Sequence, residues 1–270
     1  MVYKIHHLHC GSFCPLCAPL FGQTGLKAHF VCHCLLLETD RGLVLVDTGL
    51  GIQDYLHSKK RLGKLIHYFA AIVPDQHLSA FHQIQQLGFK PNDVRHILVT
   101  HLDFDHAGGI ADFPNATVHI LSNEFNAAQT LSAKNKLRYR PQQFQQHAYW
   151  HFLEHAAGET WFNFHRVQGF NLFKDEILII PLLGHTAGHC GIAIKQQEGY
   201  LLFCGDAYYS HLELTPKYRV WGLNWAEQLL AFDNQQRLQS LQALQTLAQT
   251  QPQIEIICAH DPLDLKKYQI

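Results

Sequence analysis

Four side chains able to bind a metal ion lie within six residues, in the segment THLDFDHAGG at positions 100–109. They are His101, Asp103, Asp105 and His106. Imidazole and carboxylate groups are the usual ligands of catalytic zinc and of related divalent ions. The segment follows an apolar run, so a strand would open here into a glycine-terminated loop whose side chains can turn toward two neighbouring points. The spacing predicts a metal site with room for two ions rather than a polar loop that only caps the next helix.

Three later fragments have the same character. They are GHTAGH at 184–189, CGD at 204–206 and CAHD at 258–261, and each follows an apolar run. A single histidine at a strand end is more often a structural residue, so each fragment is weak alone. Side chains at successive strand ends of one sheet, however, converge on one edge, where layered α/β folds hold their sites. Together the fragments predict one shared metal site.

Short apolar runs predict the strands that would position these residues. Residues 30–37 and 43–47 are typical of a hairpin, and 96–100 leads into the first metal-binding segment. Further strands are expected at 117–121, 177–183, 192–194, 201–203 and 254–258. The spacing of apolar residues predicts a helix over 75–88 and a late helix between 225 and 250. Strands mixed with helices on this scale indicate a layered α/β fold.

Two stretches, 50–74 and 123–173, do not fit this regular scaffold. The second is rich in aromatic residues. We expect both to be insertions in a single domain that spans 1–270, where they would roof a pocket. The alternative is that the aromatic side chains pack a subsidiary helical layer.

Composition narrows the range of partners. The chain has 270 residues, 47% of them hydrophobic, with 21 Lys plus Arg against 22 Asp plus Glu. Because there is no overall positive charge, neither a nucleic acid nor a membrane surface is an expected partner. The first ten residues lack the apolar stretch of a signal peptide, so a cytoplasmic location is expected. Twenty-one histidines, as many as Lys plus Arg together, again indicate metal chemistry.

Eight cysteines are expected to be reduced thiols rather than a disulfide framework. Five of them lie near the N-terminus among several histidines, enough ligands for a structural zinc: Cys10, Cys14, Cys17, Cys32 and Cys34. Cys32 and Cys34 follow a strand pattern, however, where buried cysteine acts as a small hydrophobe. Packing is therefore the preferred interpretation.

The order of the metal-binding motifs resembles the metallo-β-lactamase fold superfamily. Asp47 in VDTG comes first, followed by the 101–106 cluster, the GHTAGH turn, Asp206 and His260. Five motifs in family order, spread over most of the chain, make the resemblance specific. It implies an α/β fold of the four-layered αβ/βα sandwich type. It also implies a dinuclear metal site at one edge and hydrolysis by a metal-bridging hydroxide.

The resemblance gives each candidate residue an expected role. The first metal ion would be held by His101, Asp103 and His189, the second by Asp105, His106 and His260, and Asp206 would bridge them. Asp47 would accept a hydrogen bond from a ligand imidazole and fix its orientation. His185 matches the histidine of its turn that is not a ligand.

One position departs from the family pattern, which reads His-x-His-x-Asp-His. Here Asp103 stands in place of the second histidine. If Asp103 binds, three carboxylates face two divalent metal ions, which weakens their Lewis acidity and makes the ligand set harder. Zinc is the expected metal. The carboxylate of Asp103 favours iron or manganese more than a histidine at that position would. If Asp103 turns away, the enzyme would be mononuclear.

The residues after the bridging aspartate, Asp206-Ala207-Tyr208-Tyr209, are similar to the N-acyl homoserine lactonase branch. Tyr209 would donate a hydrogen bond to oxygen as negative charge develops on it, and Asp105 could relay a proton to the leaving group. A packing role for Tyr209 is the alternative. The expected substrate is a small-molecule ester, foremost a lactone such as an N-acyl homoserine lactone. The apolar stretch 65–69 could receive an acyl tail, although a core helix or a homodimer helix would look the same.

Other interpretations stay open. A thioesterase of the glyoxalase II kind uses the same centre, and nothing in the composition excludes it. A degenerate member that binds metal or ligand without turnover is motivated by Asp103 alone. Di-iron redox members of the family resemble longer chains with a flavin domain, for which this chain has no room.

Overall fold

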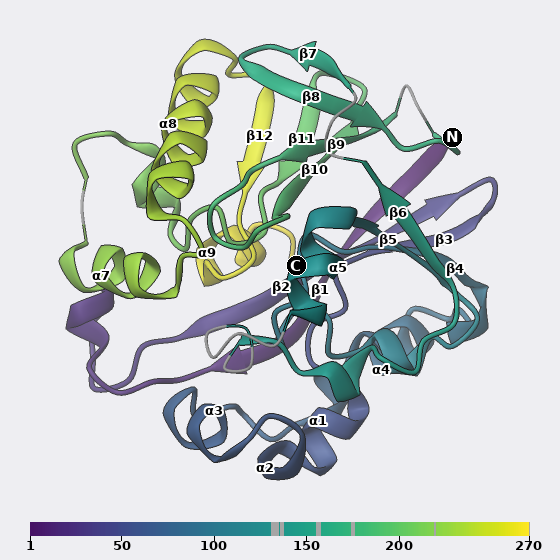
Figure 1. Cartoon of the computed structure of the whole chain (residues 1–270), viewed down its shortest axis with the longest axis horizontal. Helices are drawn as coiled ribbons and strands as arrows, with labels where there is room; N and C mark the ends of the chain where they lie inside the picture. Colours follow the sequence, from purple (N-terminus) through teal and green to yellow (C-terminus); the bar gives the residue numbers. More distant parts are fainter. Residues whose placement is uncertain (131–134, 136–137, 155–157, 174–175, 219, 270) are drawn as a thin grey trace.

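Two six-stranded sheets form the centre of the molecule (Figure 1). The computed structural model describes residues 1–130, 135, 138–154, 158–173, 176–218 and 220–269. The first sheet contains, in spatial order, β1 (Val2–Phe13), β2 (Phe30–Thr39), β3 (Gly42–Val46), β4 (Val94–Leu98), β5 (Thr117–Leu121) and β6 (Trp150–Leu153). The second contains β12 (Ile254–Ile257), β11 (Tyr200–Phe203), β10 (Cys190–Lys195), β9 (Ile177–Pro181), β8 (Phe164–Gly169) and β7 (Glu159–Trp161).

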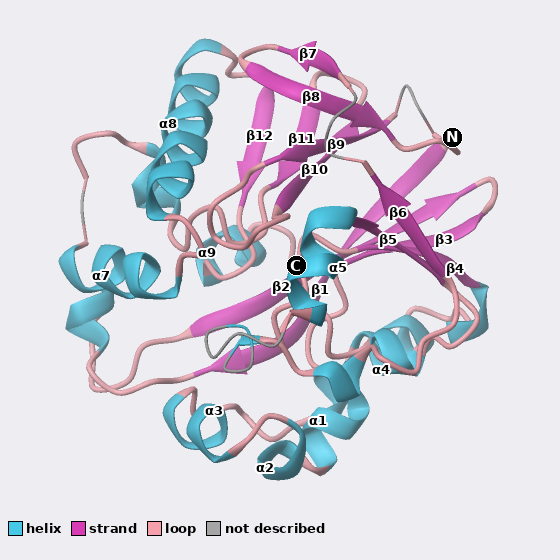
Figure 2. Cartoon of the chain, in the orientation of Figure 1, coloured by secondary structure: helices cyan, strands magenta, loops and turns pink. Residues whose placement is uncertain are grey.

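Helices cover the outer faces of the two sheets (Figure 2). Those that follow the strands of the first sheet are α1 (Ile52–Leu56), α2 (Ser58–Arg61), α3 (Lys64–Phe69), α4 (Ala80–Gln86) and α5 (Ser122–Gln129). The C-terminal half contributes α7 (Trp221–Leu230), α8 (Asn234–Thr250) and α9 (Pro262–Lys266). In the described part of the chain, no helix has both the length and the apolar composition needed to cross a membrane.

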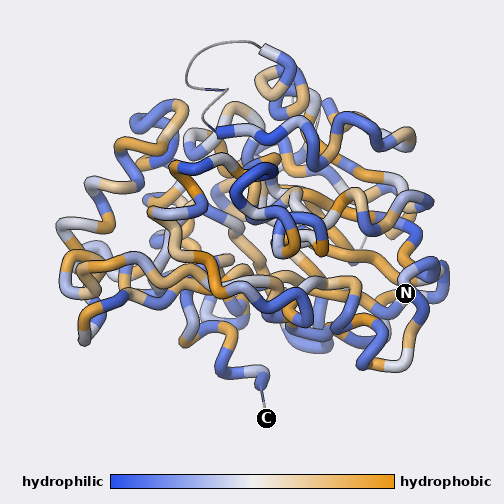
Figure 3. The backbone as a smooth tube through the Cα atoms, turned by 90° about the horizontal axis from the view of Figure 1, so that it is seen from below, coloured by the Kyte–Doolittle hydropathy of each residue, from blue (hydrophilic) through white to orange (hydrophobic). Residues whose placement is uncertain are grey.

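Alternation along the strands divides the core into layers. Leu35 and Leu37 of β2 face the second sheet, where they pack with residues such as Ile192. Leu36, between them, packs on the other face with the helices of the first half. A third cluster joins the second sheet to Leu244 of α8. Apolar segments accordingly run through the middle of the molecule in Figure 3. The predicted four-layered αβ/βα sandwich is confirmed.

The predicted elements agree with the structure in type and differ in extent. The hairpin of 30–37 and 43–47 is present as β2 and β3. The late helix, predicted as one, is two, because the chain breaks after α7 and Asp233 caps α8 by accepting from the backbone N–H groups of Gln235 and Gln236. The helix predicted over 75–88 begins only at Ala80, where the Ser79 side chain caps it.

The two irregular stretches have their own structure. Residues 50–74 form α1, α2 and α3. The described residues of 123–173 include α5 and three strands, and the Phe125 ring lies 4.9 Å from both the Trp150 and the Phe152 rings. Phe125 and Trp150 therefore pack against the core of the first sheet, although Trp150 lies on a strand and not in the subsidiary helical layer that was the alternative.

The loops that carry the metal-binding motifs meet at one edge of the sandwich. Strands β3 and β4 run parallel, as do β11 and β12, so each pair ends on the same side. Backbone hydrogen bonds then join the loops across the two sheets. Cys190 donates to the Thr100 carbonyl over 3.0 Å, and His33 donates to the Ala259 carbonyl over 2.9 Å. The sequence motifs of both halves are thereby brought together.

Candidate metal centre

Asp47, directly after β3, holds the 101–106 loop in place. Its carboxylate accepts hydrogen bonds from the Thr100 backbone N–H (2.7 Å), the Thr100 hydroxyl (2.8 Å) and His106 Nδ1 (2.8 Å). Asp47 has a φ of 53°, in the left-handed region that non-glycine residues seldom adopt. Such strain is common at functional sites, where surrounding contacts hold it. The predicted hydrogen bond, which Asp47 accepts from an imidazole, is confirmed, with His106 as the donor.

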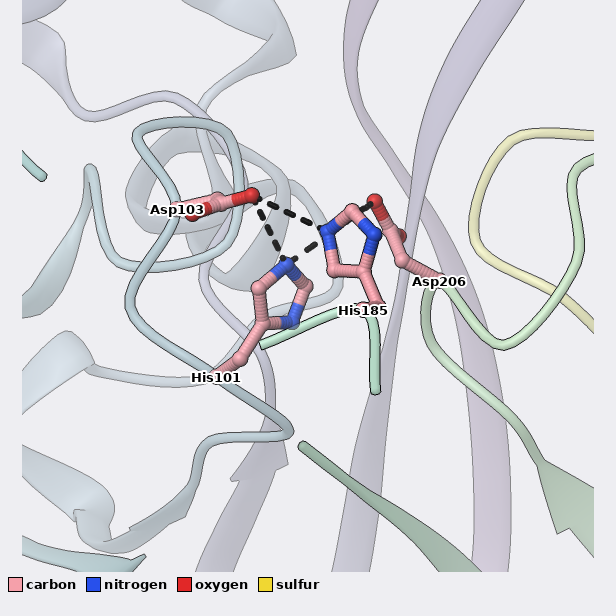
Figure 4. A group of neighbouring side chains, drawn as sticks. All are labelled: His101, Asp103, His185 and Asp206. Atoms are coloured by element: carbon pink, nitrogen blue, oxygen red, sulfur yellow. Dashed lines mark hydrogen bonds and ion pairs between the residues drawn. The ribbon is translucent and has the colours of Figure 1, made fainter. Parts of the chain in front are cut away.

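A first group of candidate ligands comprises His101, Asp103, His185 and Asp206, whose ligand atoms lie within 4.8 Å of one another. Figure 4 shows the four side chains pointing toward a common centre. Asp103 Oδ2 lies 3.5 Å from His101 Nε2 and 3.0 Å from His185 Nε2. Asp206 Oδ2 lies 3.4 Å from His185 Nε2. Asp103 thus faces the centre and does not turn away.

A second group comprises Asp105, His106 and His260. The Asp206 carboxylate lies beside this group as well, with Oδ1 at 3.0 Å from His106 Nε2 and 3.1 Å from His260 Nε2. Asp206 Oδ2 also lies 3.1 Å from His260 Nε2, so the carboxylate lies between the two groups. This is the position in which a bridging carboxylate would stand.

Three imidazoles use their outer nitrogen to fix the ring. His106 Nδ1 bonds to Asp47, His260 Nδ1 donates to the Val31 carbonyl (2.8 Å), and His101 Nδ1 lies 2.9 Å from the Thr100 hydroxyl. In each case Nε2 is left to face the centre. Such outer contacts fix the tautomer and raise the basicity of a metal-binding histidine.

The buried polar atoms at the centre fit divalent metal ions. Among the described residues, His101 Nε2, His106 Nε2, Asp206 Oδ1 and Asp103 Oδ1 are buried and make no hydrogen bond of good geometry, although His106 Nε2 and Asp206 Oδ1 lie 3.0 Å apart. Leaving such atoms unpaired is costly. Ligand atoms that bind one zinc ion at about 2.0–2.2 Å lie about 3–4 Å apart, and the histidine–carboxylate ion pairs found here have N–O distances from 3.0 to 3.8 Å. Although burial favours the neutral acid, His260 and His106 hold the pKa of Asp206 well below its ordinary value.

At the GHTAGH turn the structure differs from the prediction. His189, expected to be a ligand, has both ring nitrogens engaged by the main chain: Nδ1 donates to the Leu182 carbonyl (2.8 Å), and Nε2 accepts from the Asp206 N–H (2.9 Å). No lone pair of its ring is free for a metal ion. His185, which was left out, takes the expected place of His189 in the first group. His185 follows the end of β9, whereas His189 directly precedes β10. The rule that ligands follow strand ends would have selected His185, the histidine that lies in the first group.

Glu124, in the first turn of α5, ties the two motif loops together and was missed from the sequence. Its carboxylate is fully buried and accepts from the Leu102 N–H (3.1 Å) and from the Gly188 N–H (3.0 Å). The first loop carries His101 and Asp103, and the second carries His185. Glu124 has no motif of its own, because its role depends on two backbone groups distant in sequence.

Arg138 is a second residue that the sequence did not reveal. Its guanidinium NH1 donates to Asp103 Oδ2 over 2.6 Å. Burial favours neutral Asp103, but Arg138 and then His101 hold the pKa of this carboxyl well below its ordinary value. Asp103 is therefore ionised and has a permanent cation beside it.

A cavity of about 670 Å³ leads to both groups. Its inner end is lined by Asp103, Asp105, Asp206, His260 and Tyr209. Its walls are mainly apolar: Phe13, Pro15, Phe21, Phe30, Leu65, Ile66, Phe69, Leu223, Leu229 and Leu230. The Tyr209 ring lies 5.1 Å from the His260 ring, and burial raises the pKa of its phenol well above the ordinary value. The neighbouring Tyr208 is fully buried in the core beneath the second sheet. A mainly apolar cavity thus ends at the candidate metal centre.

Comparison with known proteins identifies the family of this chain. A profile of the metallo-β-lactamase superfamily matches residues 29–260. A protein of Mycobacterium tuberculosis described as a probable metallo-hydrolase is 38% identical over 263 residues, which cover 96% of this chain and 80% of that protein. An N-acyl homoserine lactonase of Bacillus cereus is 26% identical over 184 residues, which cover 66% of this chain and 64% of the lactonase.

Solved structures show the same fold. A variant of the Bacillus thuringiensis lactonase AiiA, with N-decanoyl-L-homoserine at its active site, superposes with a TM-score of 0.74 at 22% identity, covering 99% of this chain and 96% of that one. An N-acyl homoserine lactone hydrolase with N-hexanoyl-L-homoserine at its catalytic metal centre gives a TM-score of 0.73 at 22% identity, with the same coverage. The chain belongs to the metallo-β-lactamase superfamily.

Proposed function

We propose that this protein is a metal-dependent hydrolase that opens a lactone of the N-acyl homoserine lactone class. His101, Asp103 and His185 would hold one divalent ion and Asp105, His106 and His260 the other, with Asp206 between them. The observation that carries the proposal is the apolar cavity that ends at both groups and at Tyr209.

The walls of the cavity favour an acyl chain over a charged substrate arm. Leu65, Ile66 and Phe69 of α3 lie on its lining together with Leu223 and Leu229 of α7. A glutathione thioester would bring carboxylates and an ammonium group against these apolar side chains, which is costly. An acyl chain instead gains about 0.8 kcal/mol for each buried methylene. The cavity therefore supports an N-acyl lactone better than a glutathione thioester.

The side chains at the inner end of the cavity have separate roles. Tyr209 keeps its proton because burial raises its pKa, so its hydroxyl can donate a hydrogen bond to the substrate oxygen that gains negative charge. Asp105 lies 3.5 Å from His260 Nε2 and also lines the cavity, where its carboxylate can accept the proton that the attacking water loses and then pass it to the leaving alkoxide. Divalent ions, when bound, supply Lewis acidity and lower the pKa of a coordinated water.

The relatives support the same substrate class. Several proteins that resemble this chain are N-acyl homoserine lactonases, and two structures of the same fold hold N-acyl homoserine products. In one of those structures the product is bound at the catalytic metal centre, and the mainly apolar cavity of this chain likewise ends at the candidate metal centre.

A direct test compares two substrates that differ in the bond to be cleaved. The zinc- or manganese-loaded protein is given N-decanoyl homoserine lactone or a linear decanoyl thioester, and proton release is followed. We expect preferential opening of the lactone. In Tyr209→Phe, lactone turnover should fall about 10–100-fold with the metal content unchanged. Tyr218→Phe, on the exposed surface, is the control. Preference for the thioester, or full activity of Tyr209→Phe, would contradict the proposal.

A further inference from the structure

Arg138 makes contact with two candidate ligands of the first group. Its NH1 lies 2.6 Å from Asp103 Oδ2 and 3.1 Å from His185 Nε2, and its NH2 donates to the carbonyl of Leu230 at the end of α7. Only 9% of the Arg138 side chain is exposed. The guanidinium therefore lies beside the atoms that would bind the first ion, and Arg138 lines the cavity together with Asp103 and Asp206.

The second group has no such neighbour. In the part of the chain that the structure describes, Asp105 and Asp206 form ion pairs with histidines alone. Arginine keeps its charge under all physiological conditions and has no acceptor, so it cannot ligate a metal or be neutralised by one. A permanent cation thus stands at one half of the centre and not at the other.

The pair Arg138 and Asp103 balances its own charge. Compared with the histidine of the family pattern, Asp103 adds one negative charge to the centre, and Arg138 adds one positive charge directly beside it. An ion entering the first group meets repulsion from the guanidinium, which acts across a few ångströms in a largely buried site. The ion must also compete with the Arg138 guanidinium for Asp103 Oδ2 and His185 Nε2, because both atoms accept hydrogen bonds from Arg138 NH1.

We propose that Arg138 is a resident counter-charge for Asp103 that makes the first metal position weaker than the second, so that the two ions are held with unequal affinity. The inference rests on the metal centre given under the proposed function. Arg138 acts through Asp103 and His185 and is a positioning residue rather than a catalytic one.

The test measures metal release from the full-length protein loaded with Zn²⁺. The protein is titrated with a chromophoric chelator, and the zinc that remains bound is counted by mass spectrometry. In the wild type, one ion should leave at a chelator concentration at least tenfold below that needed for the other. In Arg138→Gln, the weakly held ion should require at least tenfold more chelator than in the wild type. Arg138→Lys keeps the charge and should release zinc as the wild type does.

Two further variants separate this role from a structural one. Arg95→Gln removes an exposed cation near the start of β4, the end of the strand away from His101, and it should leave both release steps unchanged. Asp103→His restores the family ligand but leaves Arg138 without its counter-charge. Although histidine is a good zinc ligand, Asp103→His should lose its first ion at least tenfold more easily than the wild type. The double variant Asp103→His/Arg138→Gln should recover this loss.

Each outcome bears on a defined part of the account. If Arg138→Gln and the wild type release the weakly held ion at the same chelator concentration, the proposal for Arg138 is overturned, while the metal centre itself is not. An Asp103→His variant that holds both ions as tightly as the wild type also overturns it, and that result does not depend on the folding of Arg138→Gln. A wild-type protein that binds no zinc, iron or manganese overturns the metal centre and this inference with it.

Discussion

The two halves of the centre are positioned by different kinds of contact. In the second half, His106 and His260 are oriented by Asp47 and by a backbone carbonyl, and their loops follow strands of the two sheets. In the first half, the loops are joined by Glu124, and Asp103 is paired with Arg138. Glu124 and Arg138 both come from the 123–173 stretch. The sandwich itself therefore positions one half, while side chains from an irregular stretch adjust the other.

The largest effect should come from the residue that the halves share. Asp206→Ala removes a carboxylate that faces both groups, so lactone turnover should fall about 10³-fold or more and bound metal should drop below one ion per chain. Hydrolysis rates and mass-spectrometric metal counts would measure this. Glu198→Ala, at the exposed turn between β10 and β11, is the control. Two bound ions in Asp206→Ala would show that the halves are independent.

The two histidines of the GHTAGH turn should respond in opposite ways. His185→Ala removes a candidate ligand of the first half, so about one ion per chain should be lost and activity should fall at least 100-fold. His189→Ala leaves the Asp206 N–H and the Leu182 carbonyl unpaired in the core, which costs about 2–4 kcal/mol of folding free energy. It should therefore lower the melting temperature with metal still bound. The reverse pattern, with metal lost only in His189→Ala, would restore the assignment made from sequence.

Asp47→Asn tests the half that the sandwich positions. The amide can no longer accept both from Thr100 and from His106 as the carboxylate does, so the imidazole loses part of its orientation. We expect metal affinity in the second half to fall about 10–100-fold, as is usual for such outer contacts. Competition with a chelator would measure it. A change confined to the first ion would contradict the division of the centre described here.

The smallest effect is expected from Glu124→Gln, which tests the link between the motif loops. One of the two backbone N–H groups would face the amide nitrogen and lose its acceptor, at a cost of about 1–3 kcal/mol. Thermal unfolding of the metal-free and metal-loaded protein would show this, with Glu154→Gln at the exposed surface as the control. An unchanged melting temperature would mean that Glu124 does not hold the loops.

Much of the fold could be predicted because strand patterns and ligand motifs occur together in the sequence. The apolar runs before His101, Asp206 and His260 are strands, and the family resemblance gave the sandwich correctly. The late helix was predicted as one because leucine spacing continues through 225–250. The break at Asp233 depends on its capping hydrogen bonds, which compete with the helical pattern.

The candidate ligands of the centre could be predicted from the sequence where they come directly after an apolar strand. The sequence analysis named His189 instead of His185 as a ligand because the two histidines lie within six residues. Only the strand boundaries show which of them faces the first group. Arg138 lies 35 positions from its partner, and Glu124 bonds to backbone groups that any residue would offer. Contacts of these kinds leave no local pattern to detect.

The division of the centre into two halves that share Asp206 can be tested most directly by anomalous X-ray diffraction from crystals of the metal-loaded protein. The account predicts two peaks, one contacted by Asp105, His106 and His260 and the other by His101, Asp103 and His185, with Asp206 between them. When metal is limiting, the first-named peak should be the stronger. A peak contacted by His189, or a single peak that Asp206 does not touch, would contradict it.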